Sequence, residues 1–148
     1  MATTAKNFFT PEQQADILNA VIQAELNTSG EIRVHIENEC EGDVLTRSAY
    51  IFLKLGMTNT EQHNGVLFYL AVKHRKFAVL GDAGIDTVVP ENFWDDVKTL
   101  MLNNFKEERF AEGLTKGIEL AGELLKKHFP YQKEDKNELP DDVSFGDN

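Results

Sequence analysis

A continuous apolar run, Val66-Leu67-Phe68-Tyr69-Leu70-Ala71-Val72, restricts the fold of this sequence more than any other feature. Successive side chains of a strand face opposite sides of its sheet, so a strand with no polar alternation must be covered on both faces. A second apolar segment, residues 76–80, follows the short basic link Lys73-His74-Arg75, which is typical of a hairpin loop. The run therefore predicts a central strand that is paired with the next strand and buried between two layers.

The remaining pattern supplies a further strand and several helices. Glu31–Glu37 alternates strictly, with every second residue apolar, and so predicts a strand covered on one side. Helical spacing predicts helices after Thr10-Pro11, over residues 44–55, from near Pro90, and from Phe110 to Leu125. The buried face of the helix at 44–55 is expected to hold Leu45, Ala49, Phe52 and Leu53. The fold class indicated is α/β, with a small mixed β-sheet and helices on both faces.

Length and composition fit one domain followed by an acidic tail. The chain has 148 residues, 41% of them hydrophobic, which suffices for a single core. Residues 1–130 are expected to form that domain. Residues 131–148 carry more acidic than basic residues and few apolar ones, so they are expected to be mostly flexible, with Leu139 and Phe145 as the residues that could anchor them.

Charge and cysteine content exclude several classes of function. The formal net charge of -10 disfavours nucleic acid and anionic membrane surfaces as partners, whereas it favours cations. The single cysteine, Cys40, excludes an intramolecular disulfide and a multi-cysteine metal site. There is no apolar stretch of about 18 residues, so no membrane insertion is expected. As written, the chain is expected to be cytoplasmic, or to act in the envelope or periplasm if it has been processed.

The predicted connections bring several polar residues to one edge of the sheet. If Lys73 to Arg75 closes a hairpin, Gly65 lies opposite Gly81 or Asp82. The strand–helix–strand segment before it implies that its two strands are parallel, which places Glu31 at the same edge as Asn64. Asp86 follows at once in the chain.

These residues suggest a cation site. Carboxylates from Asp82, Asp86 and Glu31, the amide of Asn64 and loop carbonyls are hard oxygen ligands, which suit Ca²⁺, and Mg²⁺ less well. The Gly-Asp-Ala-Gly-Ile-Asp segment at 81–86 is expected to be a loop that points its carbonyls inward. The alternative is that Asp82 and Asp86 simply cap the turn and the following helix. No complete catalytic motif occurs in the sequence; among the histidines only His63 lies beside this edge.

Several stretches together resemble the TPM domain family. They are Thr28-Ser29-Gly30-Glu31-Ile32-Arg33-Val34, Asn64-Gly65-Val66-Leu67, Gly81-Asp82-Ala83-Gly84-Ile85, Phe93-Trp94, Phe110 with Gly113-Leu114, and Asn137-Glu138-Leu139-Pro140. The resemblance implies an α/β/α sandwich, with calcium found in some members and acid phosphatase activity in a plant member. It carries over to Glu31, to the Asn64-Gly65 pair and to the loop at 81–84. Many members have Asp where this chain has His63, and many are exported or membrane-anchored.

Three functions follow as expectations. The first is a module that binds a divalent cation, Ca²⁺ in particular, at the acidic edge. The second is a metal-assisted acid phosphatase in which His63 is the one candidate acid or base, the catalytic residues being otherwise unknown. The third is a domain that binds a protein partner and holds a structural metal.

Overall fold

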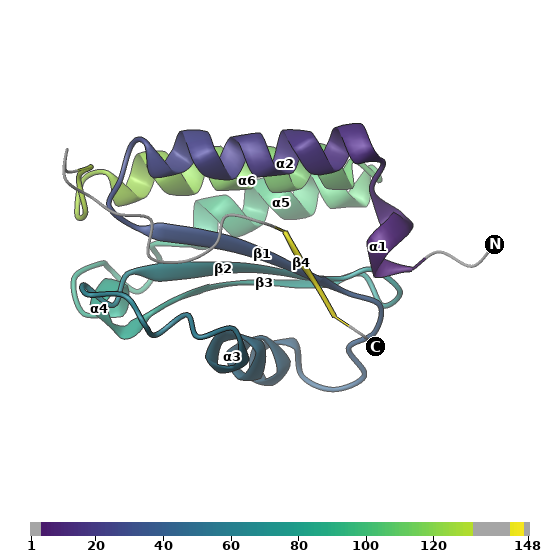
Figure 1. Ribbon diagram of the computed structural model, residues 1–148, viewed down its shortest axis with the longest axis horizontal. Coiled ribbons are helices and arrows are strands. Elements are labelled where there is room, and N and C mark those ends of the chain that lie inside the picture. Colours follow the sequence, from purple (N-terminus) through teal and green to yellow (C-terminus); the bar gives the residue numbers. More distant parts are fainter. Residues whose placement is uncertain (1–3, 132–142, 147–148) are drawn as a thin grey trace.

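A four-stranded mixed sheet forms the centre of the molecule (Figure 1). The computed structural model describes residues 4–131 and 143–146. The strands are β1 (Glu31–Glu37), β2 (Gly65–Ala71), β3 (Lys76–Gly81) and β4 (Ser144–Phe145), in the spatial order β3-β2-β1-β4. β1 is parallel to both of its neighbours, and β2 is antiparallel to β3. The predicted hairpin and the predicted parallel crossover are therefore both confirmed.

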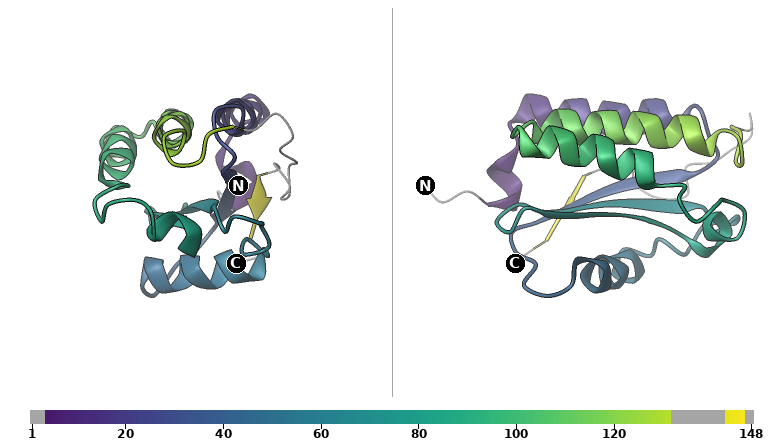
Figure 2. Two further views of the ribbon diagram at one scale, coloured as in Figure 1. Left: turned by 90° about the vertical axis from the view of Figure 1, so that its left-hand side faces the viewer. Right: turned by 180° about the vertical axis from the view of Figure 1, so that it is seen from behind.

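Helices cover both faces of the sheet, as predicted. They are α1 (Ala5–Phe8), α2 (Pro11–Glu25), α3 (Val44–Lys54), α4 (Ala83–Asp86), α5 (Asp95–Lys106) and α6 (Phe110–Leu125). α2, α5 and α6 lie side by side over one face, and α3 covers the other (Figure 2). This arrangement is an α/β/α sandwich, so the expected α/β fold class is confirmed. Within the described residues, no helix combines the length and the apolarity needed to cross a bilayer.

The central strand β2 is buried along its whole length, which confirms the interpretation of the apolar run. Phe68 packs on the side of α2, α5 and α6, and Tyr69 packs on the side of α3. The prediction for β1 is wrong in one respect, because this strand is covered on both sides. Its polar alternate residues, including His35 and Glu37, are buried beneath α3 and β4 instead of facing water.

The helix predicted at 44–55 is present as α3, but the face assigned to the core is only partly correct. Phe52 is buried as expected, whereas Ala49 is exposed and Leu45 and Leu53 are 52% and 67% exposed. Ser48 and Ile51 take their place against the sheet. Several of the apolar positions of α3 could have faced the sheet, so periodicity alone did not fix the rotation of the helix; Arg47, which reaches the buried Glu37, holds the rotation that is observed.

The helix expected from near Pro90 starts later than predicted. A series of turns follows Pro90, and α5 begins only at Asp95, with Trp94 at the cap position. The start of α2 agrees with its sequence signal, since Thr10 and Gln13 form the expected capping box. Helix starts marked by a side-chain cap are therefore better predicted here than those marked by proline alone.

The C-terminal segment contains an element that the sequence pattern did not predict. Val143–Gly146 runs along the outer edge of β1, and its central residues form β4. Phe145, expected as an anchor, packs in part against the core on the side of α2. The prediction of a flexible tail falls mainly on residues 132–142 and 147–148, which lie outside the described residues.

Candidate metal site at the sheet edge

The edge predicted from the hairpin and the crossover forms as expected. Glu31 is the register partner of Gly65 across the parallel pair, and its N–H donates to the carbonyl of Asn64 at 3.2 Å. On the other side of β2, the N–H of Asp82 donates to the carbonyl of Gly65 at 2.9 Å. Glu31, Asn64 and Asp82 therefore lie at the same end of three neighbouring strands.

One carboxylate oxygen of Asp82 accepts a hydrogen bond, and the other does not. Its Oδ1 accepts the N–H of Ala83 at 2.7 Å, so this residue caps α4 as the alternative interpretation expected. Its Oδ2 is buried and accepts no hydrogen bond from any of the described residues. The nearest positively chargeable atom is Nδ1 of His63, at 3.7 Å. A buried carboxylate oxygen without a donor is unfavourable, because it has lost its hydration.

The segment after Asp82 is a short helix, so the prediction of an open loop is wrong. The carbonyl of Asp82 accepts the N–H groups of Ile85 and Asp86, and the carbonyl of Ala83 accepts that of Thr87. These carbonyls are therefore occupied within α4. A cation at this edge has to take its oxygen atoms chiefly from side chains.

Asp86 lies on the exposed part of α4, close to Asp82. Partial burial of its carboxyl group, together with the negative charge of Asp82, raises the pKa of Asp86 above its usual value. The carboxylates of Asp82 and Asp86 therefore repel each other. The pairing that the sequence predicted for these two residues is therefore consistent with their electrostatics.

Glu31 and Asp82 lie on the same side of the sheet, the side of α3, and Gly65 separates them without a side chain of its own. A Cβ atom at Gly65 would lie 2.9 Å from the carbonyl oxygen of Met57, so this oxygen sits directly over the gap. Asn64 has other contacts: its Nδ2 donates to the hydroxyl of Ser29 at 3.3 Å. The edge thus offers two buried carboxylates with a backbone oxygen between them.

The structure brings the four predicted residues to one edge but not into one ready coordination shell. Among residues 4–131 and 143–146, no three His, Cys, Asp or Glu side chains converge closely enough to form a metal-binding group. Asp82 and Asp86 lie at the two ends of the short helix α4 and interact electrostatically, whereas Glu31 lies across β2 and Asn64 is turned toward Ser29.

The comparison with protein families agrees with the fold. The model of the TPM domain matches residues 3–124 of this chain. The chain belongs to the TPM domain family.

Solved structures show the same fold in other TPM-like chains. The protein BA42 of the psychrophilic bacterium Bizionia argentinensis is 46% identical, with a TM-score of 0.89 over 94% of this chain and 96% of BA42. An N-terminal domain from P. gingivalis is 17% identical, with a TM-score of 0.68 over 85% of this chain and 82% of that one. The N-terminal domain of cg2496 from Corynebacterium glutamicum is 12% identical, with a TM-score of 0.63 over 96% and 82%. Among curated proteins, none matches the sequence.

At the opposite end of β1, this TPM domain buries a polar network that the sequence analysis missed. Glu37, 1% exposed, accepts hydrogen bonds from Nε of Arg47 at 2.9 Å and from the hydroxyl of Tyr69 at 2.5 Å. Nε2 of His35 lies 3.4 Å from the same carboxylate. The available signal was the charged alternate positions of β1 opposite a helix that carries an arginine.

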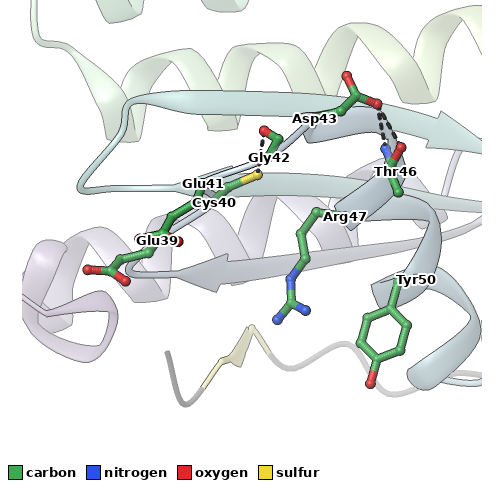
Figure 3. Close-up of a pocket in the computed structure, with 8 residues that line it drawn as sticks. All are labelled: Glu39, Cys40, Glu41, Gly42, Asp43, Thr46, Arg47 and Tyr50. Carbon is green, nitrogen blue, oxygen red and sulfur yellow. Dashed lines mark hydrogen bonds between the residues drawn. The ribbon is translucent and has the colours of Figure 1, made fainter.

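The network has a defined protonation state. Burial by itself would raise the pKa of Glu37, but the hydrogen bonds from Arg47 and Tyr69 outweigh it and lower that pKa. Burial lowers the pKa of His35, more than the nearby Glu37 raises it. At neutral pH, therefore, Glu37 is ionised and His35 is neutral. Arg47 also borders a hollow of about 520 Å³ beyond the end of β1, with Tyr50 one turn further along α3 (Figure 3).

Proposed function

We propose that this TPM domain binds a divalent cation, Ca²⁺, at the edge that carries Asp82, Asp86, Glu31 and Asn64. The observation that supports this proposal above all is Oδ2 of Asp82, which is buried and accepts no hydrogen bond from the described residues. A cation would supply the positive partner that this negatively charged oxygen lacks. It would also relieve the repulsion from Asp82, which adds to the effect of burial in raising the pKa of Asp86.

Calcium fits this edge better than magnesium. The oxygen atoms come from separate segments, namely Asp82 at the start of α4, Glu31 on β1 and the carbonyl of Met57. Ca²⁺ accepts roughly 6 to 8 oxygen ligands in flexible geometry and can include water, whereas Mg²⁺ needs a nearly ideal octahedron. A site that must be completed by small movements of side chains therefore favours Ca²⁺.

The first test is Asp82→Asn, which keeps the shape of the side chain and removes its charge. We expect the variant to bind Ca²⁺ about 10-fold or more weakly, as follows from losing a charged interaction of about 1.5–3 kcal/mol. The measurement is a two-dimensional amide NMR titration with Ca²⁺ and, separately, with Mg²⁺. Asp96→Asn is the matched control, because it removes the same charge from an exposed position on α5.

The titration also locates the site. Ca²⁺ is expected to shift the amide signals of residues near Asp82 and Glu31, and Asp96→Asn is expected to bind as tightly as the parent. If Asp82→Asn binds Ca²⁺ as tightly as the parent, the carboxylate of Asp82 is only a helix cap and the proposed site is wrong.

Calcium affinity should depend on pH through Asp86. Its pKa is raised by partial burial and by Asp82, so it takes up a proton at a higher pH than an ordinary aspartate, whose pKa is about 3.9. We expect affinity to fall as the pH is lowered toward this raised pKa, because a protonated carboxyl group is a poor ligand. In Asp86→Asn the fall should begin at lower pH. Isothermal titration calorimetry between pH 4 and pH 7 measures both curves, and identical curves would exclude Asp86 from the site.

A metal-assisted phosphomonoesterase is the second candidate, favoured by the position of His63. Its imidazole is 61% exposed and lies 3.7 Å from Oδ2 of Asp82, where it could exchange a proton with a bound phosphate ester. A bound cation would supply polarisation of a phosphate oxygen. Turnover of a phosphomonoester that depends on both Ca²⁺ and His63 would favour this candidate. Binding of Ca²⁺ without turnover would leave a binding module or a protein-interaction domain with a structural metal.

A further inference from the structure

The C-terminal strand β4 is held on β1 by backbone hydrogen bonds over a short, defined length. His35 pairs with Ser144 and Ile36 with Phe145, in parallel register. The N–H of Gly146 continues the ladder and donates to the carbonyl of Ile36 at 2.8 Å. In Figure 1 the strand lies across the open edge of the sheet, beside β1.

The rest of this edge is closed by a side chain. Nearer the start of β1, the N–H of Ile32 donates to a carboxylate oxygen of Glu25 at 2.9 Å. This carboxylate, at the end of α2, blocks further pairing in that direction. A strand that docks on β1 is therefore restricted to the segment occupied by β4, close to the polar network around Glu37.

The side chains on one face of β4 are matched to this network. The hydroxyl of Ser144 lies 2.6 Å from Nδ1 of His35. Gly146 packs so tightly that a Cβ atom there would lie 2.5 Å from Cγ of Glu37. Glu37 cannot easily yield, because Arg47 and Tyr69 hold its carboxylate. Only glycine fits at the second of these two positions.

The other face of β4 is apolar. Val143 and Phe145 pack in part against the core on the side of α2. The edge of β1 therefore contacts four successive residues, which are in order apolar, serine, apolar and glycine. Alternate side chains of this segment meet different surroundings on the two faces of the sheet. Backbone hydrogen bonds for affinity and alternating side-chain contacts for specificity are the two features of peptide recognition by strand addition.

We propose that the outer edge of β1 from Val34 to Glu37 is a peptide-binding groove, and that β4 is its intramolecular occupant. The partner is another protein that presents an extended segment of the pattern apolar-Ser-apolar-Gly, which runs parallel to β1. A tethered segment competes at an effective concentration of about millimolar. The partner therefore binds when β4 has left the groove, and β4 acts as the plug that controls access.

The experiment opens the groove in the full-length chain. Gly146→Val introduces side-chain atoms where Glu37 stands and should release β4. Faster hydrogen exchange of the amide of residue 146, which donates to the carbonyl of Ile36 in the parent, would report the release. Phe145→Asp is a second, independent way to release the strand, since it places a charge against the apolar core. Gly42→Val is the matched control, because a Cβ atom at Gly42 would meet no other atom within 4 Å.

The probe is a fluorescent synthetic peptide with the sequence of residues 139–148. It should bind Gly146→Val and Phe145→Asp, and return the amide signals of His35 and Ile36 toward their positions in the parent. The parent and Gly42→Val should show at least 10-fold weaker binding, because β4 occupies their groove. A peptide with alanine in place of Ser144 should bind about 2- to 12-fold more weakly, as expected for one lost hydrogen bond.

Any of the following results would overturn the proposal. The parent and the opened variants could bind the peptide equally well, which would place the peptide elsewhere. The opened variants could release β4 and still fail to bind the peptide, or β4 could stay docked in both. A peptide with valine in place of Gly146 that binds as tightly as the natural one would show that Glu37 does not select glycine at this position. Dimerisation of the opened variants, seen by sedimentation, would instead assign the groove to a second copy of this chain.

Discussion

Arg47→Met should lower the free energy of unfolding by up to about 3–5 kcal/mol, the range found when a buried charge is left without its partner; Arg47 itself is 32% exposed. Glu37, 1% exposed, would keep its negative charge and lose the two hydrogen bonds from Arg47. Methionine fills much of the same volume, so the loss reports the charge more than the packing. Equilibrium unfolding in urea, followed by circular dichroism, measures the effect.

A matched control separates this effect from the loss of any surface charge. Lys73 pairs with Glu39 at 2.7 Å, but the two side chains are 64% and 37% exposed. Lys73→Met should therefore change stability by no more than about 1 kcal/mol. Equal losses in the two variants would contradict the view that Glu37 depends on Arg47. A second substitution, Glu37→Gln in the Arg47→Met background, should recover part of the stability, because it removes the unpaired charge.

Much of the fold follows from rules that relate neighbouring segments of the sequence. The apolar run predicted β2, the basic link predicted the hairpin, and the crossover rule placed Glu31 beside Asn64 and Asp82. Each of these steps needs only local pattern and strand direction. They sufficed to bring the candidate ligands to one edge, though not to show how each side chain is used there.

What the sequence could not predict depends on contacts between distant segments. The rotation of α3 is held by Arg47 on a buried partner, and β4 forms because Ser144 and Gly146 fit against residues more than a hundred positions earlier. At the candidate site, the short helix α4 replaced an expected loop. Composition alone predicts that the carbonyls of this segment face a cation, whereas they accept backbone hydrogen bonds within α4.

Gly84→Ala should destabilise the protein by about 2–4 kcal/mol and weaken Ca²⁺ binding. A Cβ atom at Gly84 would lie 2.2 Å from the carbonyl oxygen of Gln62 and 2.5 Å from that of His63. Both are backbone atoms, so α4 or the segment before β2 must move. Overpacking of this kind costs about 1–3 kcal/mol. The hydrogen bond from the N–H of Gly84 to His63, now 2.9 Å, would add about 0.5–1.5 kcal/mol if it broke.

The effect on Ca²⁺ follows from the same contact, because the close approach of Gly84 to His63 sets the position of Asp82 at the start of α4. Thermal unfolding and Ca²⁺ titration of Gly84→Ala should therefore change together. Gly42→Ala is the control: a Cβ atom there would meet no other atom within 4 Å, and stability should stay within about 1 kcal/mol of the parent. A Gly84→Ala variant with lower stability and unchanged Ca²⁺ affinity would show that the cation does not depend on the position of Asp82.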